Sequence, residues 1–314
     1  MASLSYNLLL KCSWLQRIPY LAPAWQSAWN KGCQSFSGPV RTTIHGRKAL
    51  VNYGHTYPLT SRRCRTFNNP VVELVFQSYS VEKRPITLVD VGANVGDTIL
   101  LLEANCPGMV GDFFCVDADP GFFACLVNNL GELGRGKLLL ALLSSTAGSE
   151  KSLIRTHPGT ASAQGVGSIC STTLDSLLLD AVGSGIDVVK TDVDGLDGKV
   201  LEGAKEILRN HQPAVIFEWH PLACRGTGNN WTDHFDVLEQ CGYEHFVWYT
   251  KYGEFSHYSG RGERASLEML ADLCLRSEFY QDWHYDVIAL PSRYLPCRLP
   301  LAELAYARKR VSTH

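Results

Sequence analysis

The sequence predicts an α/β protein with a mostly parallel, seven-stranded sheet and helices on both of its faces. From Ile86 onward, short runs rich in β-branched and aromatic residues alternate with segments of helical periodicity. That alternation is typical of a parallel sheet covered on both sides. The chain has 314 residues, which is enough to bury a full hydrophobic core without a disulfide or a structural metal.

An extension is expected before the sheet. A helical start is followed by the apolar segments 40–44 and 49–53, with His45 and Gly46 between them, and this pattern predicts a β-hairpin that forms a lid or an edge. The expected divisions of the chain are a helical and hairpin extension, one α/β domain and a C-terminal tail, at residues 1–80, 81–298 and 299–314.

The elements of the domain follow from local pattern. Asp119 and Pro120 are typical of an N-cap and a first helical residue, so a helix is predicted at 121–130. Apolar periodicity predicts a second helix at 198–209, and Thr232 is expected to cap a third. The seven strands are expected at 86–91, 112–117, 137–143, 186–193, 214–219, 243–249 and 285–290.

One segment of the domain has no helical period. Residues 148–171 are rich in Gly, Ser, Thr and Ala. We expect a mobile hairpin or loop there, lying over one end of the sheet.

Charge and cysteine content restrict the partner and the compartment. The chain has 29 Lys and Arg against 31 Asp and Glu, a net charge of -2, which gives no electrostatic case for a nucleic-acid partner or an anionic membrane. A small molecule or carbohydrate is the expected substrate. The 11 cysteines include no C-x-x-C pair. Free thiols in apolar segments favour a reducing compartment, so a cytoplasmic location is expected.

The N-terminal segment is not expected to cross a membrane. Its apolar run 8–10 is interrupted by Lys11 and Arg17, whereas a spanning helix needs about 20 apolar residues. Lys11 also follows the apolar run, unlike the charge of a signal peptide. We expect a helix packed on the domain. The alternative is weak contact with a membrane surface through Trp14, Tyr20 and Trp25.

A glycine-rich loop follows the first strand of the sheet. Asp90 ends the strand, Gly92 and Gly96 form a Gly-x-x-x-Gly turn, and an apolar helix begins at Thr98. Such glycines let the backbone approach a nucleotide closely. A dinucleotide fingerprint has glycine where this chain has Asn94. A nicotinamide-dependent dehydrogenase is therefore the less favoured interpretation.

A second carboxylate, Asp117, ends the next strand. At the switch point of an open sheet, a carboxylate in this place accepts hydrogen bonds from the ribose diol of a bound nucleoside. Asp90 would then contact the loop backbone or a positively charged group of the ligand. The alternative is that Asp90 and Asp117 only cap helices.

The motifs as a set resemble those of the FkbM family of methyltransferases. The resemblance covers roughly residues 40 to 291 and implies the class I methyltransferase fold, which is Rossmann-like. The segments that carry it are Val89-Asp-Val-Gly-Ala-Asn-Val-Gly96, Val116-Asp-Ala-Asp-Pro120, Thr173-Leu-Asp-Ser-Leu177, Val189-Lys-Thr-Asp-Val-Asp-Gly195, Glu202-Gly-Ala204 and Val215-Ile-Phe-Glu-Trp-His220.

The resemblance also implies a cofactor and a reaction. They are S-adenosylmethionine and methyl transfer to a hydroxyl of a sugar, a glycan or a small natural product. Asp117 and Asp194 stand where the family usually has Glu, so both side chains are one methylene shorter. A non-catalytic cofactor-binding or interaction module is therefore the alternative. The expected cofactor contacts are Asp90, Gly92, Ala93, Asn94, Gly96, Thr98, Asp117, Ala118, Ser144 and Asp192.

Five ionisable residues form the predicted acceptor site. In extended strands alternate residues share a face, which groups Lys190 with Asp192 and Asp194, and Glu218 with His220. The carboxyl ends of parallel strands form the crevice where such sheets bind ligands. A hydroxyl needs a base to remove its proton, and Asp192 or His220 is the expected general base.

Two other interpretations of these residues stay open. Lys190 and Asp192 can form an ion pair that only holds neighbouring strands together. Asp192, Asp194, Glu218 and His220 are also of the types that bind metal ions, although we expect no metal here.

Overall fold

The computed structural model describes residues 1–148, 150–157, 159–179, 185–276 and 283–301. Its central sheet has eight strands in the order β12-β11-β13-β10-β9-β3-β4-β5. Neighbours from β10 to β5 are parallel, whereas β13 is antiparallel to both β10 and β11. The strands are β3 (Ile86–Val91), β4 (Val110–Asp117), β5 (Gly136–Leu140), β9 (Val188–Thr191), β10 (Ala214–Trp219), β11 (His245–Thr250), β12 (Phe255–Gly260) and β13 (Tyr285–Leu290).

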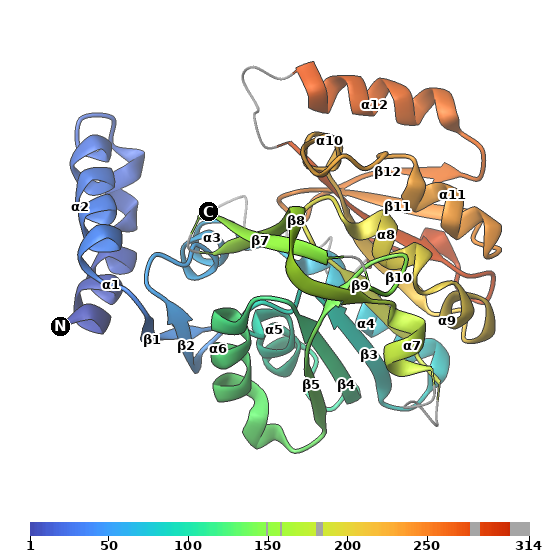
Figure 1. The fold of residues 1–314 in the computed structure, drawn as a ribbon, viewed down its shortest axis with the longest axis horizontal. Helices are drawn as coiled ribbons and strands as arrows, with labels where there is room; N and C mark the ends of the chain where they lie inside the picture. The colour runs from blue at the N-terminus through green and yellow to red at the C-terminus, as the bar shows by residue number, and fades with distance from the viewer. Residues whose placement is uncertain (149, 158, 180–184, 277–282, 302–314) are drawn as a thin grey trace.

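Helices cover both faces of this sheet, as predicted (Figure 1). Neighbouring residues of one strand belong to different cores: Leu88 packs with one face and Val89 with the other. The first core includes α4 (Asn69–Glu82), α5 (Asp97–Asn105) and α6 (Pro120–Leu130). The second core includes α7 (Leu174–Leu178), α8 (Asp197–Glu202), α9 (Lys205–Asn210), α11 (Asp233–Gln240) and α12 (Arg264–Arg276).

The edge strand β12 was not predicted from the sequence. It pairs only with β11 among the described strands. Its residues Phe-Ser-His-Tyr-Ser-Gly are mostly half-buried or exposed, so its sequence lacks the apolar character of the central strands. Ser259 of β12 accepts a hydrogen bond from the indole of buried Trp248 at 2.8 Å.

The prediction of one continuous helix at 198–209 is wrong, because the helix is interrupted. It consists of α8 and α9, which are separated at Gly203 and Ala204. Asp175 begins the second helix by accepting hydrogen bonds from the backbone of Glu206 and Ile207 at 2.9 and 3.0 Å. A long-range cap therefore overrides the continuous helical period.

The strand predicted at 137–143 is also divided. Its first part is β5, and its last residues form β6 (Leu142–Leu143) in a separate three-stranded sheet of order β6-β8-β7. The strands β7 (Glu150–His157) and β8 (Thr160–Thr172) are antiparallel. The segment expected to be a hairpin or a loop is therefore a hairpin.

The N-terminal extension contains the predicted hairpin, β1 (Pro39–Ile44) and β2 (Arg47–Asn52). It is preceded by α1 (Ala2–Lys11), η1 (Ser13–Arg17) and α2 (Ala22–Ser35), and followed by α3 (Tyr57–Arg63). The helices α1 and α2 project from the body on the left of Figure 1. In the part of the chain that the structure describes, no helix is long and apolar enough to span a bilayer.

The alternative of membrane contact through Trp14, Tyr20 and Trp25 is wrong for Trp25. This residue is buried. Its indole donates to the Leu9 carbonyl at 3.0 Å and stacks on Trp29 at 5.1 Å. Trp25 therefore joins α2 to α1.

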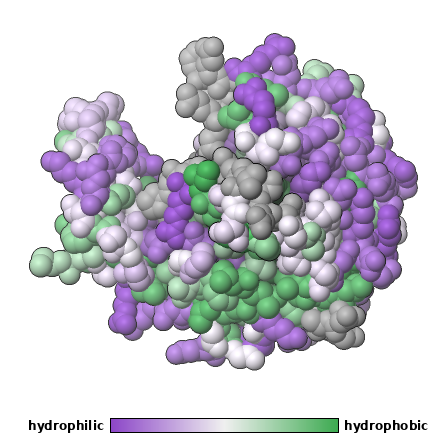
Figure 2. All heavy atoms as spheres, viewed as in Figure 1, coloured by the Kyte–Doolittle hydropathy of each residue, from purple (hydrophilic) through white to green (hydrophobic). Residues whose placement is uncertain are grey.

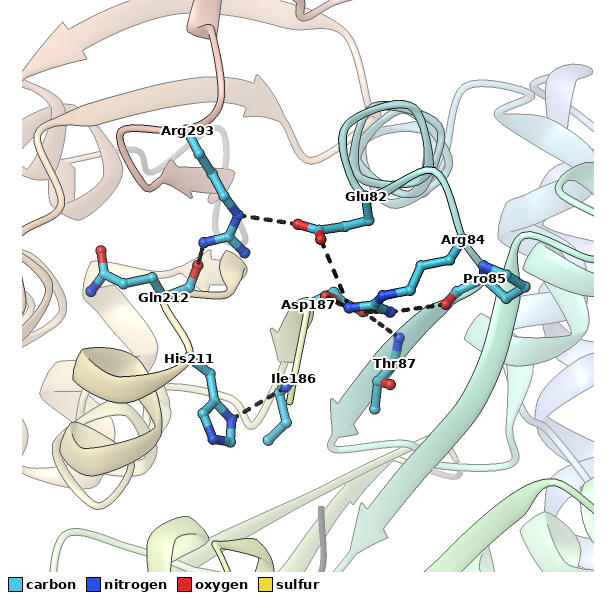
Figure 3. A network of polar contacts seen from close by, with 9 residues as sticks. All are labelled: Glu82, Arg84, Pro85, Thr87, Ile186, Asp187, His211, Gln212 and Arg293. Carbon is cyan, nitrogen blue, oxygen red and sulfur yellow. Dashed lines mark hydrogen bonds and ion pairs between the residues drawn. The ribbon is translucent and has the colours of Figure 1, made fainter. Parts of the chain in front are cut away.

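A polar network holds the amino ends of β3 and β9 together, at the end of the strands opposite their carboxyl tips (Figure 3). The buried carboxylate of Asp187 accepts two hydrogen bonds from Arg84, both at 2.8 Å, and one from the Thr87 backbone at 2.8 Å. Glu82 connects Arg84 to Arg293. This network fixes the relative position of the two strands whose other ends carry the candidate site.

Three short elements complete the described chain: η2 (Gly131–Leu133), α10 (Pro221–Thr227) and η3 (Pro296–Arg298). The predicted tail at 299–314 lies outside the described residues beyond Leu301. All 11 cysteines are described and are free thiols.

Candidate functional site

A cavity of about 220 Å³ lies at the carboxyl ends of β3, β4 and β9. Its floor comes from the ends of these strands and the loops that follow them, including Gly92, Asp117 and Asp192. Two other parts of the chain form its walls. The β7–β8 hairpin contributes Leu153, Gly159, Thr160 and Ala161. The extension contributes His55, Thr56, Tyr57 and Thr60 around the start of α3, with Phe67 and Asn68 before α4.

The glycine loop is shaped by contact with the protein itself. Gly92 has φ +76, and a Cβ atom there would lie 2.0 Å from the backbone oxygen of Asp192. Its amide donates to the Val116 carbonyl at 2.9 Å. The sequence pattern predicts that this glycine permits the approach of a ligand, but the close neighbour in the structure is the backbone that follows β9.

Asn94 joins three parts of the chain at the cavity. Its backbone amide donates to Asp117 at 2.7 Å, and its side-chain amide donates to the Gly159 carbonyl at 2.8 Å. Its side-chain oxygen accepts from His55 Nε2 at 2.9 Å. Because His55 Nδ1 accepts from the Tyr57 backbone, Nε2 carries the proton of the neutral ring. The loop is therefore bonded to the extension and to the β7–β8 hairpin.

Asp117 lies in the cavity floor, and its side chain also binds the backbone of the neighbouring loops. One carboxylate oxygen accepts from the Asn94 amide at 2.7 Å and the other from the Asp119 amide at 2.8 Å. Burial raises the pKa of Asp117 to about 7, although these two hydrogen bonds act in the opposite direction. A carboxylate oxygen can accept more than one hydrogen bond, so Asp117 keeps capacity for a ligand hydroxyl.

A buried lysine lies between carboxylates at the centre of the site. Lys190 Nζ is 3.3 Å from Asp90 and 3.2 Å from Asp192. Burial opposes the charge of Lys190, but Asp192, Asp90 and Asp97 together raise its pKa well above the usual value. Burial also raises the pKa of Asp97 to about 7. The cluster therefore holds one cation among several carboxyl groups.

Half of the expected cofactor contacts line the cavity. Those in its lining are Gly92, Asn94, Asp117, Ala118 and Asp192. Those outside its lining are Asp90, Ala93, Gly96, Thr98 and Ser144. Asp90 and Thr98 are buried, and Thr98 gives a hydrogen bond that favours the charged form of Asp90. These two residues therefore interact with each other outside the lining of the cavity.

The predicted acceptor residues are divided between two places. Lys190, Asp192 and Asp194 line the cavity, whereas Glu218 and His220 are not in its lining. The prediction from strand alternation is wrong for Asp194, because β9 ends at Thr191 and Asp194 has φ +51. A turn, not an extended strand, brings Asp194 to the cavity.

Glu218 and His220 belong to a neighbouring group that includes His284. Glu218 lies 3.3 Å from His284 Nε2, and the rings of His220 and His284 are 5.1 Å apart. His220 Nδ1 accepts from the Ala223 amide at 3.4 Å at the start of α10. Burial, followed by the charges of Asp192 and Asp194, raises the pKa of Glu218. The two groups therefore interact electrostatically.

Sequence reasoning missed Asp97, His55 and His284. Asp97 directly follows the glycine loop, so its position was a usable signal. His55 and His284 are far from the loop in sequence and gave no local signal. Among the described residues, no group of three or more His, Cys, Asp or Glu side chains is arranged to hold a metal ion.

Comparison with known proteins decides the family. Residues 90–245 match the Methyltransferase FkbM domain. The chain contains an FkbM methyltransferase domain. This match includes the glycine loop, Asp117 and the Lys190 cluster, so the FkbM domain contributes most of the cavity floor. No curated protein matches the sequence.

Several solved structures similar to this chain are methyltransferases, all of low sequence identity to it. One is Methyltransferase FkbM from Methylobacillus flagellatus KT, with 14% identity and a TM-score of 0.39; the alignment covers 65% of this chain and 43% of that chain. Another is Precorrin-6y C5,15-methyltransferase from Geobacter metallireducens GS-15, with 14% identity, a TM-score of 0.37 and coverage of 70% and 87%. The plantazolicin methyltransferase BpumL, solved with SAH, has 13% identity, a TM-score of 0.34 and coverage of 74% and 87%.

The FkbM domain has the class I methyltransferase fold. Its mostly parallel sheet, covered on both faces, places the glycine loop and the end of β4 side by side. Membership of this family supports methyl transfer that depends on S-adenosylmethionine.

Proposed function

We propose that this protein binds S-adenosylmethionine in the 220 Å³ cavity and methylates a hydroxyl oxygen of a sugar, a glycan or a small natural product. One observation carries the proposal: Asp117 and the Lys190–Asp192 pair line the same cavity from adjacent loops. Asp117 would accept hydrogen bonds from a nucleoside, and Asp192 of the pair would accept the proton of an acceptor hydroxyl.

The residues of the cavity fit the cofactor by their chemistry. Asp117 is a hydrogen-bond acceptor for the ribose diol. Val116, Ala118 and Leu142 give apolar surface for the adenine ring. The carboxylates around Lys190 include Asp192, which is half exposed and can face the positive charge of the cofactor.

The reaction needs a base on the acceptor side. When bound, S-adenosylmethionine would supply an electrophilic methyl group to the acceptor oxygen and would leave as S-adenosylhomocysteine. Asp192 would receive the hydroxyl proton, with Lys190 at 3.2 Å holding that carboxylate in place. Glu218 and His220, with His284, form the second candidate group for proton transfer.

The two other functions are less well supported. Asn94 occupies the position of the second glycine of a dinucleotide fingerprint, and its side chain is bonded to His55 and Gly159. This arrangement opposes pyrophosphate binding by a dehydrogenase. The shortened Asp194 is the feature that favours a non-catalytic module, although it lies in the cavity wall.

Calorimetric titrations with S-adenosylhomocysteine and with NAD test the proposal. We expect binding of S-adenosylhomocysteine and none of NAD. At a concentration about 100-fold above its Kd, the bound ligand should stabilise the fold by about 2.7 kcal/mol, which raises the thermal midpoint. Methyl transfer from labelled S-adenosylmethionine is then measured over a panel of sugars and hydroxylated metabolites. Binding without transfer to any acceptor would favour the non-catalytic module.

A further inference from the structure

The net charge of -2 conceals an uneven distribution along the chain. Residues 1–72 contain no Asp or Glu. The basic residues in this segment are nine: Lys11, Arg17, Lys31, Arg41, Arg47, Lys48, Arg62, Arg63 and Arg65. The remaining 20 of the 29 Lys and Arg residues share the rest of the chain with all 31 acidic residues. The extension is therefore strongly basic, and the domain that follows is acidic.

A row of exposed side chains runs along α1 and η1. We call it the N-terminal stripe, and its members are Leu4, Leu8, Lys11, Trp14, Arg17 and Tyr20. In α1, spacings of four and three residues place Leu4, Leu8 and Lys11 on one side of the helix. Trp14 and Arg17 are three residues apart in η1, and Tyr20 lies in the turn that follows it. The opposite side of α1 packs against the protein through Tyr6 and Leu10.

The stripe is unusual for a surface helix because it is apolar as well as basic. Leu4 is 77% exposed, Leu8 59%, Trp14 57% and Tyr20 79%. Single exposed apolar residues are ordinary, but a contiguous set marks an interaction surface. The lobe of α1 and α2 projects from the body (Figure 1), and hydrophobic and hydrophilic residues are mixed on its visible face (Figure 2).

We propose that the N-terminal stripe docks the protein on an anionic lipid surface. Leucine and tryptophan side chains insert into the boundary between headgroups and acyl chains, and Lys and Arg beside them contact anionic headgroups. The absence of acidic residues in 1–72 removes the repulsion that such a surface would otherwise meet. Exposed leucines distinguish this surface from one for nucleic acid, where cations and aromatic rings suffice.

The same chain offers a matched control surface. On α12, Met269 and Leu273 form an exposed apolar pair four residues apart, 75% and 53% exposed. Their neighbours Glu268 and Asp272 are acidic. The two surfaces are alike in apolar exposure and opposite in charge, so only the N-terminal stripe should bind an anionic membrane.

Sedimentation of the full chain with vesicles tests this inference independently of methyl transfer. We expect binding to vesicles of equal parts phosphatidylcholine and phosphatidylserine, weak binding to phosphatidylcholine alone, and release in high salt. Both Leu4→Ser with Leu8→Ser and Lys11→Gln with Arg17→Gln should lower the partition coefficient about tenfold or more. Met269→Ser with Leu273→Ser should leave it unchanged. Each variant should keep the wild-type unfolding midpoint.

Several outcomes would overturn the inference. They are no binding to the anionic vesicles, equal binding to both vesicle types, and an equal loss in the α12 variant. Light scattering supplies a further check. If the protein does not bind vesicles but forms a dimer that dissociates in the variant Leu4→Ser with Leu8→Ser, the stripe is an interface between two copies. If the protein binds RNA but not vesicles, and the leucine substitutions leave RNA binding unchanged, the basic surface is a nucleic-acid site.

Discussion

At the scale of single residues, the site depends on carboxyl groups that burial makes harder to ionise. Asp117 and Asp97 both have a pKa of about 7, with burial as the largest cause. Burial also raises the pKa of Asp90, and Lys190, 3.3 Å away, acts in the opposite direction. The charge of the site near neutral pH is therefore set by burial and by one lysine.

Asp117 should make cofactor binding depend on pH. As pH rises through about 7, Asp117 ionises and becomes a stronger acceptor for the ribose diol, so affinity for S-adenosylhomocysteine should rise. The ligand-free protein should show the opposite trend. The pKa of Asp117 is raised in the folded state, so the contribution of Asp117 to the free energy of unfolding falls as pH rises from about 4 to about 7.

Calorimetry at several pH values measures both affinity and its trend. Asp117→Ala should weaken binding by about one to two decades and should reduce the rise in affinity with pH near 7. Asp112→Ala is the control, because Asp112 lies on the same strand and is exposed. Unchanged affinity in Asp117→Ala would remove Asp117 from the binding site.

Substitution of Asp192 tests the general base. Asp192 lines the cavity, whereas His220 lies outside its lining. We therefore expect Asp192→Asn to lower turnover by about two to four decades with an active acceptor, a loss larger than any change in Kd for S-adenosylhomocysteine. His220→Ala should have the smaller effect, and a chelator should have none. The reverse order would assign the base to His220, and full turnover in both variants would exclude both residues.

At the scale of elements, the site depends on how closely the loop after β3 approaches the turn after β9. The absence of a Cβ at Gly92 permits this contact, since a Cβ atom there would lie only 2.0 Å from the backbone oxygen of Asp192. The network of Asp187 and Arg84 holds the other ends of the same strands. The two strands are thus held together at both ends.

Gly92→Ala should combine backbone strain with a steric clash. Gly108 has the same φ of +76 and nothing within 4 Å of an added Cβ, so Gly108→Ala is a matched control. The control should lose about 1–2 kcal/mol of unfolding free energy from the left-handed backbone alone. Gly92→Ala should lose about 2–5 kcal/mol, because overpacking adds to that strain. Denaturant titration measures both, and equal losses would mean that the loop adjusts without cost.

At the scale of the whole molecule, the extension is connected to the cofactor loop. The buried hydroxyl of Tyr6 in α1 donates to the His55 carbonyl at 2.6 Å. His55 in turn donates to Asn94 at 2.9 Å. Three residues thus connect the projecting helices to the glycine loop, and the extension forms part of the cavity wall.

Tyr6→Phe should reveal that connection. The variant removes a buried hydrogen bond and should lose about 1–3 kcal/mol of unfolding free energy. Tyr20→Phe is the control and should change stability by less than about 0.5 kcal/mol, because Tyr20 is 79% exposed. Tyr6→Phe should also bind S-adenosylhomocysteine more weakly. A loss of stability with unchanged affinity would show that the extension packs on the domain without affecting the loop.

The sequence by itself determined the features that depend on neighbouring residues. The strand at 86–91, the glycine turn after it and the helix capped by Asp119 were all predicted and are present. Asp119 accepts from Gly121 and Phe122, as an N-cap should. Each of these features is specified within a few residues, so its signal is readable without knowledge of the fold.

Only the tertiary structure decided which distant residues meet at the cavity. His55, Asn94 and Gly159 come from the extension, the loop and the hairpin, and hydrogen bonds join them. The turn at Asp194 and the separation of His220 from the cavity also depend on how strands end and helices begin around them. The physical reason is that long-range packing and hydrogen bonding, not local periodicity, place these side chains.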